Sequence, residues 1–546
     1  MSAETVVIGK IYTADGGDFA EAMAISDGKT VFVGSERDAM RLCSKDTTII
    51  RRSGLIVPGM TEGHAHVTCA SEALFGVALG RAEDPEEYIF RIREYLAAHP
   101  SASAVIGSGY DNSVFGDQGP TAKLLDTVSS DIPIIMIASD HHSRWVNSKA
   151  LALAGITKDT ADPLNGKIMR FPDGEPTGWL KESAMSLVNA VTPKLSPDEY
   201  AEAIKYYQGI ALSYGVTNIF EPMFDSLRDY RARAEGYKIA DEAGELYLTC
   251  RLGYSLEEGD DLDAAIKAML AIRRDLSSCG NVKLDTAKFF ADGVVECHTA
   301  YLRDDYSDAA GDRGAPTISR GTLTKYARLA LENGFNVHTH VIGDGAVDLA
   351  LDAYDDAVSD IGKIDIMPRL ALTHLQIVAP DQIKRMKKLG VYAVTNPYWH
   401  YTSEAYYEKL EKPYLGEKRA AGEYPMRSLV DAGIPVSQAS DFPVTVPPNT
   451  MHALHLMVTR KDPEDASAPA LNAAECVSRR EALDILTIGG AKQLGLDGTK
   501  GSIEVGKDAD FVVLDKDVFD IDDDALCSVE VLETYVGGVL RYKKIK

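Results

Sequence analysis

The sequence predicts an α/β protein in which a parallel (β/α)8 barrel is inserted into a small β domain built from both ends of the chain. Three observations predict this arrangement. Strand-like runs alternate with helical stretches through the middle of the chain, short β-type segments occur at both ends, and several central runs end in histidine, lysine or aspartate. Strands that alternate with helices are typical of a parallel sheet, and a barrel gathers the strand ends at one mouth.

The size and composition limit the possible functions of the protein. The chain has 546 residues, which is too long for one simple core. Its net charge of −25 argues against nucleic acid or an anionic membrane as a partner, so we expect a small-molecule substrate. No apolar run reaches the roughly 18 residues of a membrane helix, and the N-terminal residues lack a signal-peptide pattern. The seven cysteines show no CxxC spacing, which indicates reduced thiols and a cytoplasmic protein. The oligomeric state stays open, with a homodimer as one option.

Short β-branched segments at the two ends of the chain predict the β domain. They are Thr5–Ile8, Ala22–Ile25, Thr30–Val33 and Thr48–Ile50 at the start, and Phe511–Leu514 and Val529–Leu540 at the end. Neither end is large enough to bury a core alone. We therefore expect residues 1–56 and 496–546 to pack together, with residues 57–495 forming the barrel.

The middle of the chain supplies eight strand candidates. They are Leu55–Val57, Gly215–Glu221, Glu245–Gly253, Asp285–Phe290, Phe335–Val341, Leu370–Leu375, Gly390–Asn396 and Ile434–Asp441. Helical stretches such as Thr322–Asn333, Gly345–Ala357 and Pro380–Leu389 lie between them. A doubly wound open sheet is the alternative, but it would not naturally gather polar groups from strands across its whole width.

About 150 residues separate the first two strand candidates, far more than one connection needs. We interpret residues 68–200 as an inserted subdomain. Because it leaves the barrel just after a strand end, we expect it to cover the mouth as a lid. Tyr110, His142 and Trp145 in this segment are candidates for substrate contact, although packing inside the insertion explains His142 and Trp145 slightly better.

Potential metal ligands lie at or just past the ends of five strand candidates. His64 and His66 lie two residues apart, so in an extended chain both imidazoles point to the same side. A bare His-X-His pair is often only a pair of surface histidines. Its significance rises here because further candidates follow other strands, namely Lys288, His340, His374 and Asp441. Imidazole and carboxylate are the ligands expected for a catalytic zinc.

At this point a family resemblance becomes plain. The matching stretches are LIVPGMTEGHAH, HHSRWVNSKALALAGIT, AKFFADGVVECHTA, VHTHVIGDGAV, LTHLQIVAPDQIKRMKKLGVYAVTNP, ASDFPV and GSIEVGKDADFVVLD, and they cover nearly the whole chain. The chain resembles the amidohydrolase superfamily, specifically the YtcJ-like branch, amidohydrolase family 3, which includes N-substituted formamide deformylase. The resemblance implies a distorted (β/α)8 TIM-type barrel, a β-sandwich from both termini and a centre of one or two divalent metal ions, with zinc expected.

The resemblance also implies residue roles. The ligands carried over by motif position are His64, His66, Lys288, His340, His374 and Asp441. A bound metal would turn water into a hydroxide nucleophile at neutral pH. Asp441 would carry the proton of that water to the leaving group, and His374 is the second residue with a catalytic role. Lys288 is expected to be N6-carboxylated and to bridge two metals. The alternative is an ordinary ammonium paired with Asp292 beside a single metal.

Other polar residues near the strand ends receive weaker assignments. Glu296 is a candidate for lining the substrate pocket, and His338 has either a supporting or a core role. His141, His400 and Tyr398 receive no role.

These residues predict a metal-dependent hydrolase that cleaves a non-peptide C–N bond, in a small amide or an N-substituted formamide. A cyclic amide or amidine, hydrolysed or deaminated at the same centre, is the alternative within the class. Isomerisation or decarboxylation could use the same ligands. A non-catalytic small-molecule-binding scaffold is a further alternative, but such a scaffold would usually have lost a ligand, and here all six positions are filled.

Overall fold

A computed structural model describes residues 2–17, 19–80, 82–163, 166–222, 229–361, 367–465 and 467–545. These residues form two compact units. The first contains 1–65, 207–223 and 240–546, and the second contains 66–206 with the described part of 224–239. None of the described helices is both long enough and apolar enough to cross a bilayer.

The barrel sheet of the first unit has eight strands in the order β18-β17-β16-β15-β14-β13-β12-β5. Their bounds are β5 (Met60–Glu62), β12 (Val216–Glu221), β13 (Thr249–Ser255), β14 (Val282–Phe290), β15 (Asn336–Val341), β16 (Leu370–His374), β17 (Tyr392–Thr395) and β18 (Val436–Gln438). All neighbours pair in parallel. The backbone N–H of Gly63 donates to the carbonyl oxygen of Gln438 over 2.9 Å, which draws the first and last strands together. The predicted barrel is confirmed.

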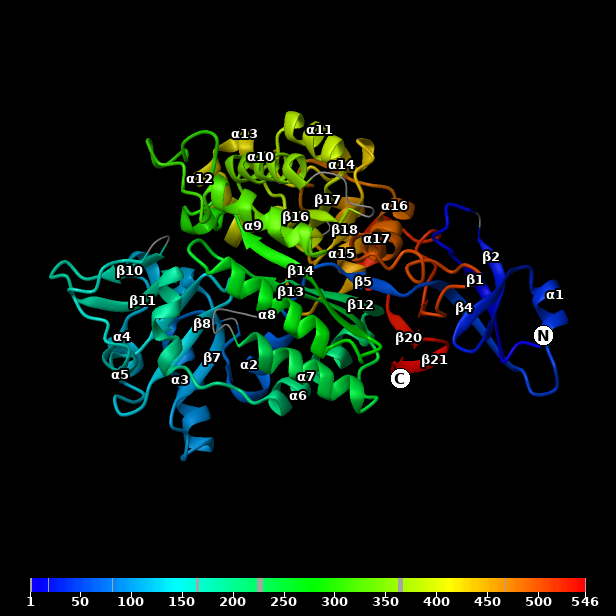
Figure 1. Ribbon diagram of the computed structural model, residues 1–546, viewed down its shortest axis with the longest axis horizontal. Coiled ribbons are helices and arrows are strands. Elements are labelled where there is room, and N and C mark those ends of the chain that lie inside the picture. Colours follow the sequence, from blue (N-terminus) through cyan, green and yellow to red (C-terminus); the bar gives the residue numbers. More distant parts are fainter. Residues whose placement is uncertain are drawn as a thin grey trace. The chain divides into compact units, whose positions relative to one another are not determined.

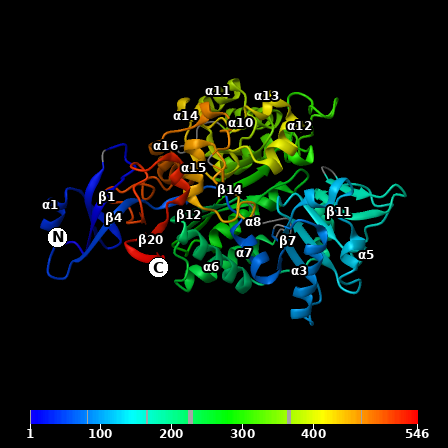
Figure 2. The same ribbon diagram turned by 180° about the vertical axis from the view of Figure 1, so that it is seen from behind.

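Helices alternate with these strands along the chain. Before β17 they are α6 (Pro197–Ser213), α7 (Tyr230–Glu242), α8 (Leu262–Asp275), α9 (Arg320–Glu332), α10 (Asp344–Ile361) and α11 (Pro380–Leu389). Between β17 and β18 they are α12 (Lys412–Leu415), α13 (Glu417–Ala420) and α14 (Met426–Asp431). After β18 they are α15 (Thr450–Thr459), α16 (Arg479–Asp484) and α17 (Gly490–Leu494). Figure 2 shows α10, α11 and α14 on the outer side of the sheet. α11 shows how one such connection ends, because Gly390 takes a left-handed φ of 67° after its last turn and β17 follows.

Both ends of the chain contribute to one seven-stranded sheet, as predicted. Its order is β21-β20-β19-β4-β1-β2-β3, and its blue N-terminal and red C-terminal strands lie together in Figure 1. The strands are β1 (Thr5–Ile11), β2 (Ala20–Ser26), β3 (Lys29–Gly34), β4 (Thr48–Pro58), β19 (Phe511–Leu514), β20 (Val531–Val536) and β21 (Val539–Lys543). Hydrogen bonding joins all seven strands into one continuous sheet.

The first barrel strand is not where the sequence placed it. Leu55–Val57 belongs to β4, which pairs with β1 and β19 of the terminal sheet, and the barrel begins at β5. Gly59 separates the two strands. A Cβ atom there would lie 2.3 Å from Thr217 Oγ1, so only glycine fits this crossing point. An apolar run shows that a strand is buried, but not which sheet it joins.

The second unit carries its own six-stranded sheet, in the order β10-β11-β9-β8-β7-β6. The strands are β6 (Val77–Ala78), β7 (Val105–Tyr110), β8 (Ile134–Ala138), β9 (Ser143–Val146), β10 (Gly166–Arg170) and β11 (Pro176–Glu182), and the helices are α2 (Ala70–Phe75), α3 (Pro85–Ala98), α4 (Ala122–Asp126) and α5 (Ser148–Leu153). The domain limits drawn from the sequence, and the lid role of residues 68–200, stay predictions.

Candidate metal centre

Three of the predicted ligands meet inside the first unit. One ligand atom each from His64, His374 and Asp441 lies within 4.8 Å of the other two, and all three residues are buried. His64 Nε2 lies 3.2 Å from Asp441 Oδ1. The three lie at or just past the ends of the first, sixth and eighth barrel strands, and only β17 separates the sixth strand from the eighth in the sheet. Neutral imidazoles with a carboxylate form a donor set that suits a zinc-type ion.

Burial keeps the His64 imidazole in its metal-binding form. The pKa of His64 lies well below its ordinary value, because burial disfavours the cation and the charge of Lys288 adds to the effect. A neutral ring has a lone pair available for a metal, whereas a protonated ring does not.

Asn396 fixes the ring of His374. Its amide nitrogen donates to the carbonyl of Ala439 over 3.1 Å, so its oxygen faces His374 Nδ1 at 2.9 Å. The Nδ1–H must then be the donor, which leaves Nε2 with its lone pair. Trp399 stacks on the same imidazole at 5.4 Å between ring centroids. Partners of this kind hold the tautomer and orientation of a metal-binding histidine.

The backbone at two of the three clustered residues has an unusual, left-handed conformation. His374 and Asp441 have left-handed φ angles of 74° and 57°, and Leu375 has 54°. Such angles are uncommon outside glycine and are a strained conformation for leucine. At His374 they fall at the last residue of β16, where the chain must leave the sheet abruptly.

Lys288 is completely buried, and its Nζ has no hydrogen-bond partner among the described residues. Burial lowers the pKa of Lys288 to about 7, against the opposing charge of Asp441. Asp292, the expected partner of an ordinary ammonium, instead accepts backbone N–H groups of Ile342, Gly343 and Tyr301. The structure therefore does not show the hydrogen-bonded Lys288–Asp292 pair that we considered.

His340 and His66 lie outside the three-atom cluster. His340 is buried with its ring centroid 4.5 Å from that of His374, and its Nε2 lies 3.1 Å from the carbonyl oxygen of Gly293. His66 is half-buried and precedes the short helical turn Val67–Cys69. Both histidines of the His-X-His pair follow the end of β5 and do not continue an extended strand. The roles of His66 and His340 as metal ligands stay predictions.

The candidate substrate residues have varied surroundings. Tyr110 and Trp145 are fully buried in the core of the second unit, and the Trp145 indole N–H donates to the carbonyl of Thr121 over 2.7 Å. His142 is half-buried, with its Nδ1 3.0 Å from Glu182 Oε2. Glu296 lies half-buried in the turn Val295–Cys297 of the first unit. Packing accounts for Tyr110 and Trp145, and substrate contact by any of the four stays a prediction.

Three supporting residues received no firm role from the sequence. His338 Nε2 lies 2.9 Å from His64 Nδ1, and Asn396 holds His374. Glu62 accepts the backbone N–H groups of His64 and Ser440, and burial raises its pKa to about 8. Glu62 is the last residue of β5, and Asn396 follows β17. A search for polar residues at the carboxyl ends of the barrel strands, which led to the predicted ligands, would therefore also have found Glu62 and Asn396.

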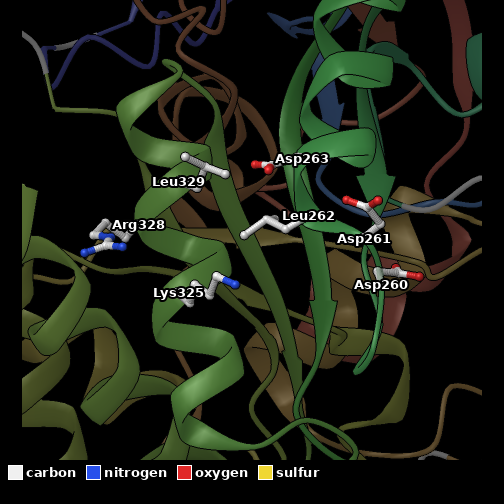
Figure 3. A pocket seen from close by; sticks show the side chains of 7 residues that line it. All are labelled: Asp260, Asp261, Leu262, Asp263, Lys325, Arg328 and Leu329. Carbon is white, nitrogen blue, oxygen red and sulfur yellow. The ribbon is translucent and has the colours of Figure 1, made fainter.

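A hollow of about 370 Å³ lies elsewhere in the first unit, between the start of α8 and one face of α9. Figure 3 shows Lys325 and Arg328 on one helix and the aspartates on the other side. Its lining residues are Asp260, Asp261, Leu262, Asp263, Lys325, Arg328 and Leu329. None of the predicted ligands lines this hollow.

Comparison with known proteins agrees with the barrel. The model of the amidohydrolase family matches residues 53–542. The chain belongs to the amidohydrolase family.

Among its relatives, this amidohydrolase is 28% identical to the putative amidohydrolase YtcJ of Bacillus subtilis, over 98% of each chain. It is 29% identical to the N-substituted formamide deformylase of Arthrobacter pascens, over 96% of this chain and 95% of the relative. A crystal structure of an uncharacterised metal-dependent hydrolase from Pyrococcus horikoshii shares the fold, with a TM-score of 0.75 and 22% identity over 95% of this chain and 99% of that one. The predicted family is confirmed.

We expect Asn396→Ala to weaken metal binding by about 10–100-fold, because His374 loses the group that fixes its tautomer. Metal competition against a coloured chelator would measure the change. Thr395→Val is the matched control, since it removes a buried hydrogen bond from β17 to the carbonyl oxygen of Ser437 on β18 and leaves the hydrogen bond between Asn396 and His374 in place. Parent-like affinity in Asn396→Ala would contradict the positioning role.

Proposed function

We propose that this amidohydrolase cleaves the C–N bond of a small amide, most specifically an N-substituted formamide, with one or two divalent metal ions at the His64, His374 and Asp441 centre. The observation that carries the proposal is the gathering of these three ligand atoms within 4.8 Å in a buried barrel mouth. The likeness to a formamide deformylase over almost the whole chain supports the choice of substrate class. His66, Lys288 and His340 are the further ligands that we propose.

The residues present fit a zinc-type ion, because a buried carboxylate and neutral imidazoles are its preferred oxygen and nitrogen donors. A divalent ion bound there would lower the pKa of a water molecule and polarise the substrate carbonyl. Asp441 then accepts the proton of the attacking water and delivers it to the leaving nitrogen, first as general base and then as general acid. Asn396 and Trp399 keep the His374 ring in place during both transfers.

Metal analysis tests this proposal first. We expect the barrel centre of protein purified without chelators to hold one or two zinc-like ions, and prolonged chelation followed by dialysis to abolish hydrolysis until metal is restored. An active sample with far less than one ion per chain would refute the metal-dependent function.

A substrate panel tests the bond that is cleaved. The metal-loaded protein should be assayed with N-formyl, N-acyl and cyclic amides, by detecting the released amine. We expect turnover of N-substituted formamides above that of the other classes. Preferential opening of cyclic amides would replace the formamide with the cyclic alternative, and no turnover with full metal content would favour a binding scaffold.

A further inference from the structure

A second group of metal-ligating side chains lies inside the second unit. Cys69, Glu72 and His141 each offer one ligand atom, and these three atoms lie within 4.8 Å of one another. Cys69 precedes the first residue of α2 and Glu72 follows three positions later, so both can face the same side of this short segment. His141 comes from the turn between β8 and β9, where it takes a left-handed φ of 61°. All three residues belong to the same compact unit.

The donor types indicate a particular class of ion. A thiolate, an imidazole and a carboxylate together suit zinc and its close relatives, whereas magnesium and calcium prefer oxygen donors alone. Ligand atoms around one tetrahedral zinc ion lie roughly 3.3–3.6 Å apart, as its usual bond lengths imply. Separations of up to 4.8 Å need only side-chain adjustments of about an ångström to close around such an ion.

An independent observation points to a missing cation. Glu72 Oε2 is buried and accepts no hydrogen bond from any of the described residues. A buried carboxylate oxygen without a hydrogen bond is unfavourable unless a cation lies nearby. Arg144 supplies part of that charge, since Glu72 acts on it electrostatically. The guanidinium nevertheless directs one nitrogen to Met185 and Asn189, and pairing of Glu72 with Arg144 would not explain why a thiol and an imidazole meet at the same place.

We propose that Cys69, Glu72 and His141 form a second metal site of the zinc type, which shares no residue with the centre at His64, His374 and Asp441. A bound ion would cross-link the start of α2 to the β8–β9 turn and so stabilise the second unit. The site has a structural role and does not depend on the identity of the substrate.

Cobalt substitution distinguishes the two sites, because only the second one contains a thiolate. The metal-free full-length protein should be titrated with Co²⁺ while absorbance is recorded. We expect the near-ultraviolet charge-transfer band of a cobalt–thiolate bond in the parent protein. Cys69→Ser should lose this band and bind about one ion fewer per chain, while retaining the visible absorption of cobalt at the barrel centre. Cys43→Ser is the matched control, since Cys43 is a half-buried free cysteine in the first unit, and it should keep the band.

A second variant keeps the proposal testable if Cys69→Ser fails to fold. His141→Asn suits the left-handed backbone at this position, because asparagine tolerates positive φ. The apparent affinity for Co²⁺, measured from the cobalt–thiolate band, should fall by at least tenfold. The circular dichroism spectrum should stay unchanged. A parent protein without the band would overturn the proposal, and so would a band that survives in Cys69→Ser.

Discussion

Replacing Asp441 with asparagine is expected to lower kcat by roughly 10²–10⁴, the usual contribution of a positioned acid–base group. This range corresponds to about 2.7–5.4 kcal/mol of transition-state stabilisation. The reason is chemical, because the amide keeps the shape of the carboxylate but cannot accept the proton of the attacking water. Asp441 is positioned for that transfer by its own backbone N–H, which donates to the carbonyl of His64 over 2.9 Å.

Steady-state kinetics at saturating metal, with metal content measured on the same sample, would test Asp441→Asn. The variant should retain its metal and its fold, so the loss should appear in kcat and not in metal occupancy. Asp431→Asn is the control, since Asp431 is exposed on α14 and pairs only with Arg427 among the ion pairs of the described residues. Turnover near the parent rate would exclude Asp441 as the proton shuttle.

Lys288→Ala is expected to lose bound metal and activity together. Carboxylation joins the neutral amine nitrogen to the carbon of CO₂ and releases a proton, which leaves an anionic group with two oxygen donors. The lysine must be unprotonated for this reaction, and burial already lowers the pKa of Lys288 to about 7. Raising the pH through 7 therefore increases the reactive fraction, whereas lowering it restores the inert ammonium. Reconstitution of metal-free protein with bicarbonate should improve over the same interval.

Chemical rescue separates a carboxylated lysine from a merely structural one. Acetate or propionate with excess metal should restore part of the metal content and activity of Lys288→Ala, by replacing the two missing oxygens. Lys283→Ala is the matched control on the same strand, where the side chain is exposed, and it should behave like the parent. Full metal content in Lys288→Ala would contradict a ligand role for this lysine.

The sequence predicted the barrel well because several strands carry two kinds of information. A run such as Leu370–His374 is buried along its whole length, and it ends in a candidate metal ligand. The first strand escaped prediction because β5 has only three residues, and the longer apolar run Leu55–Val57 lies just before it. Hydrophobicity could not show that this run completes a different sheet.

The sequence led to three side chains that lie close together in the candidate centre, but it led less well to the groups that support them. The strand-end rule led to His64, His374 and Asp441, which do meet. Partners such as Asn396 depend on which side-chain atoms face each other, and spacing along the sequence does not contain that information. The same limit left His141 without a role, because its neighbours Cys69 and Glu72 are about seventy positions earlier in the chain.

The single-residue link at Gly59 has a consequence for the timing of synthesis. β4 leads through Gly59 directly into β5 and then to His64, so the strand before the metal centre is anchored in the terminal sheet. That sheet is complete only when the last strands arrive, and Arg52 on β4 pairs with Glu533, 481 positions later. At about 5–20 residues per second, a ribosome needs roughly 24–96 s to cover that interval. Until β19 is made, the edge of β4 that it pairs with has no neighbour, so a nascent chain exposes a strand edge of the kind that chaperones protect.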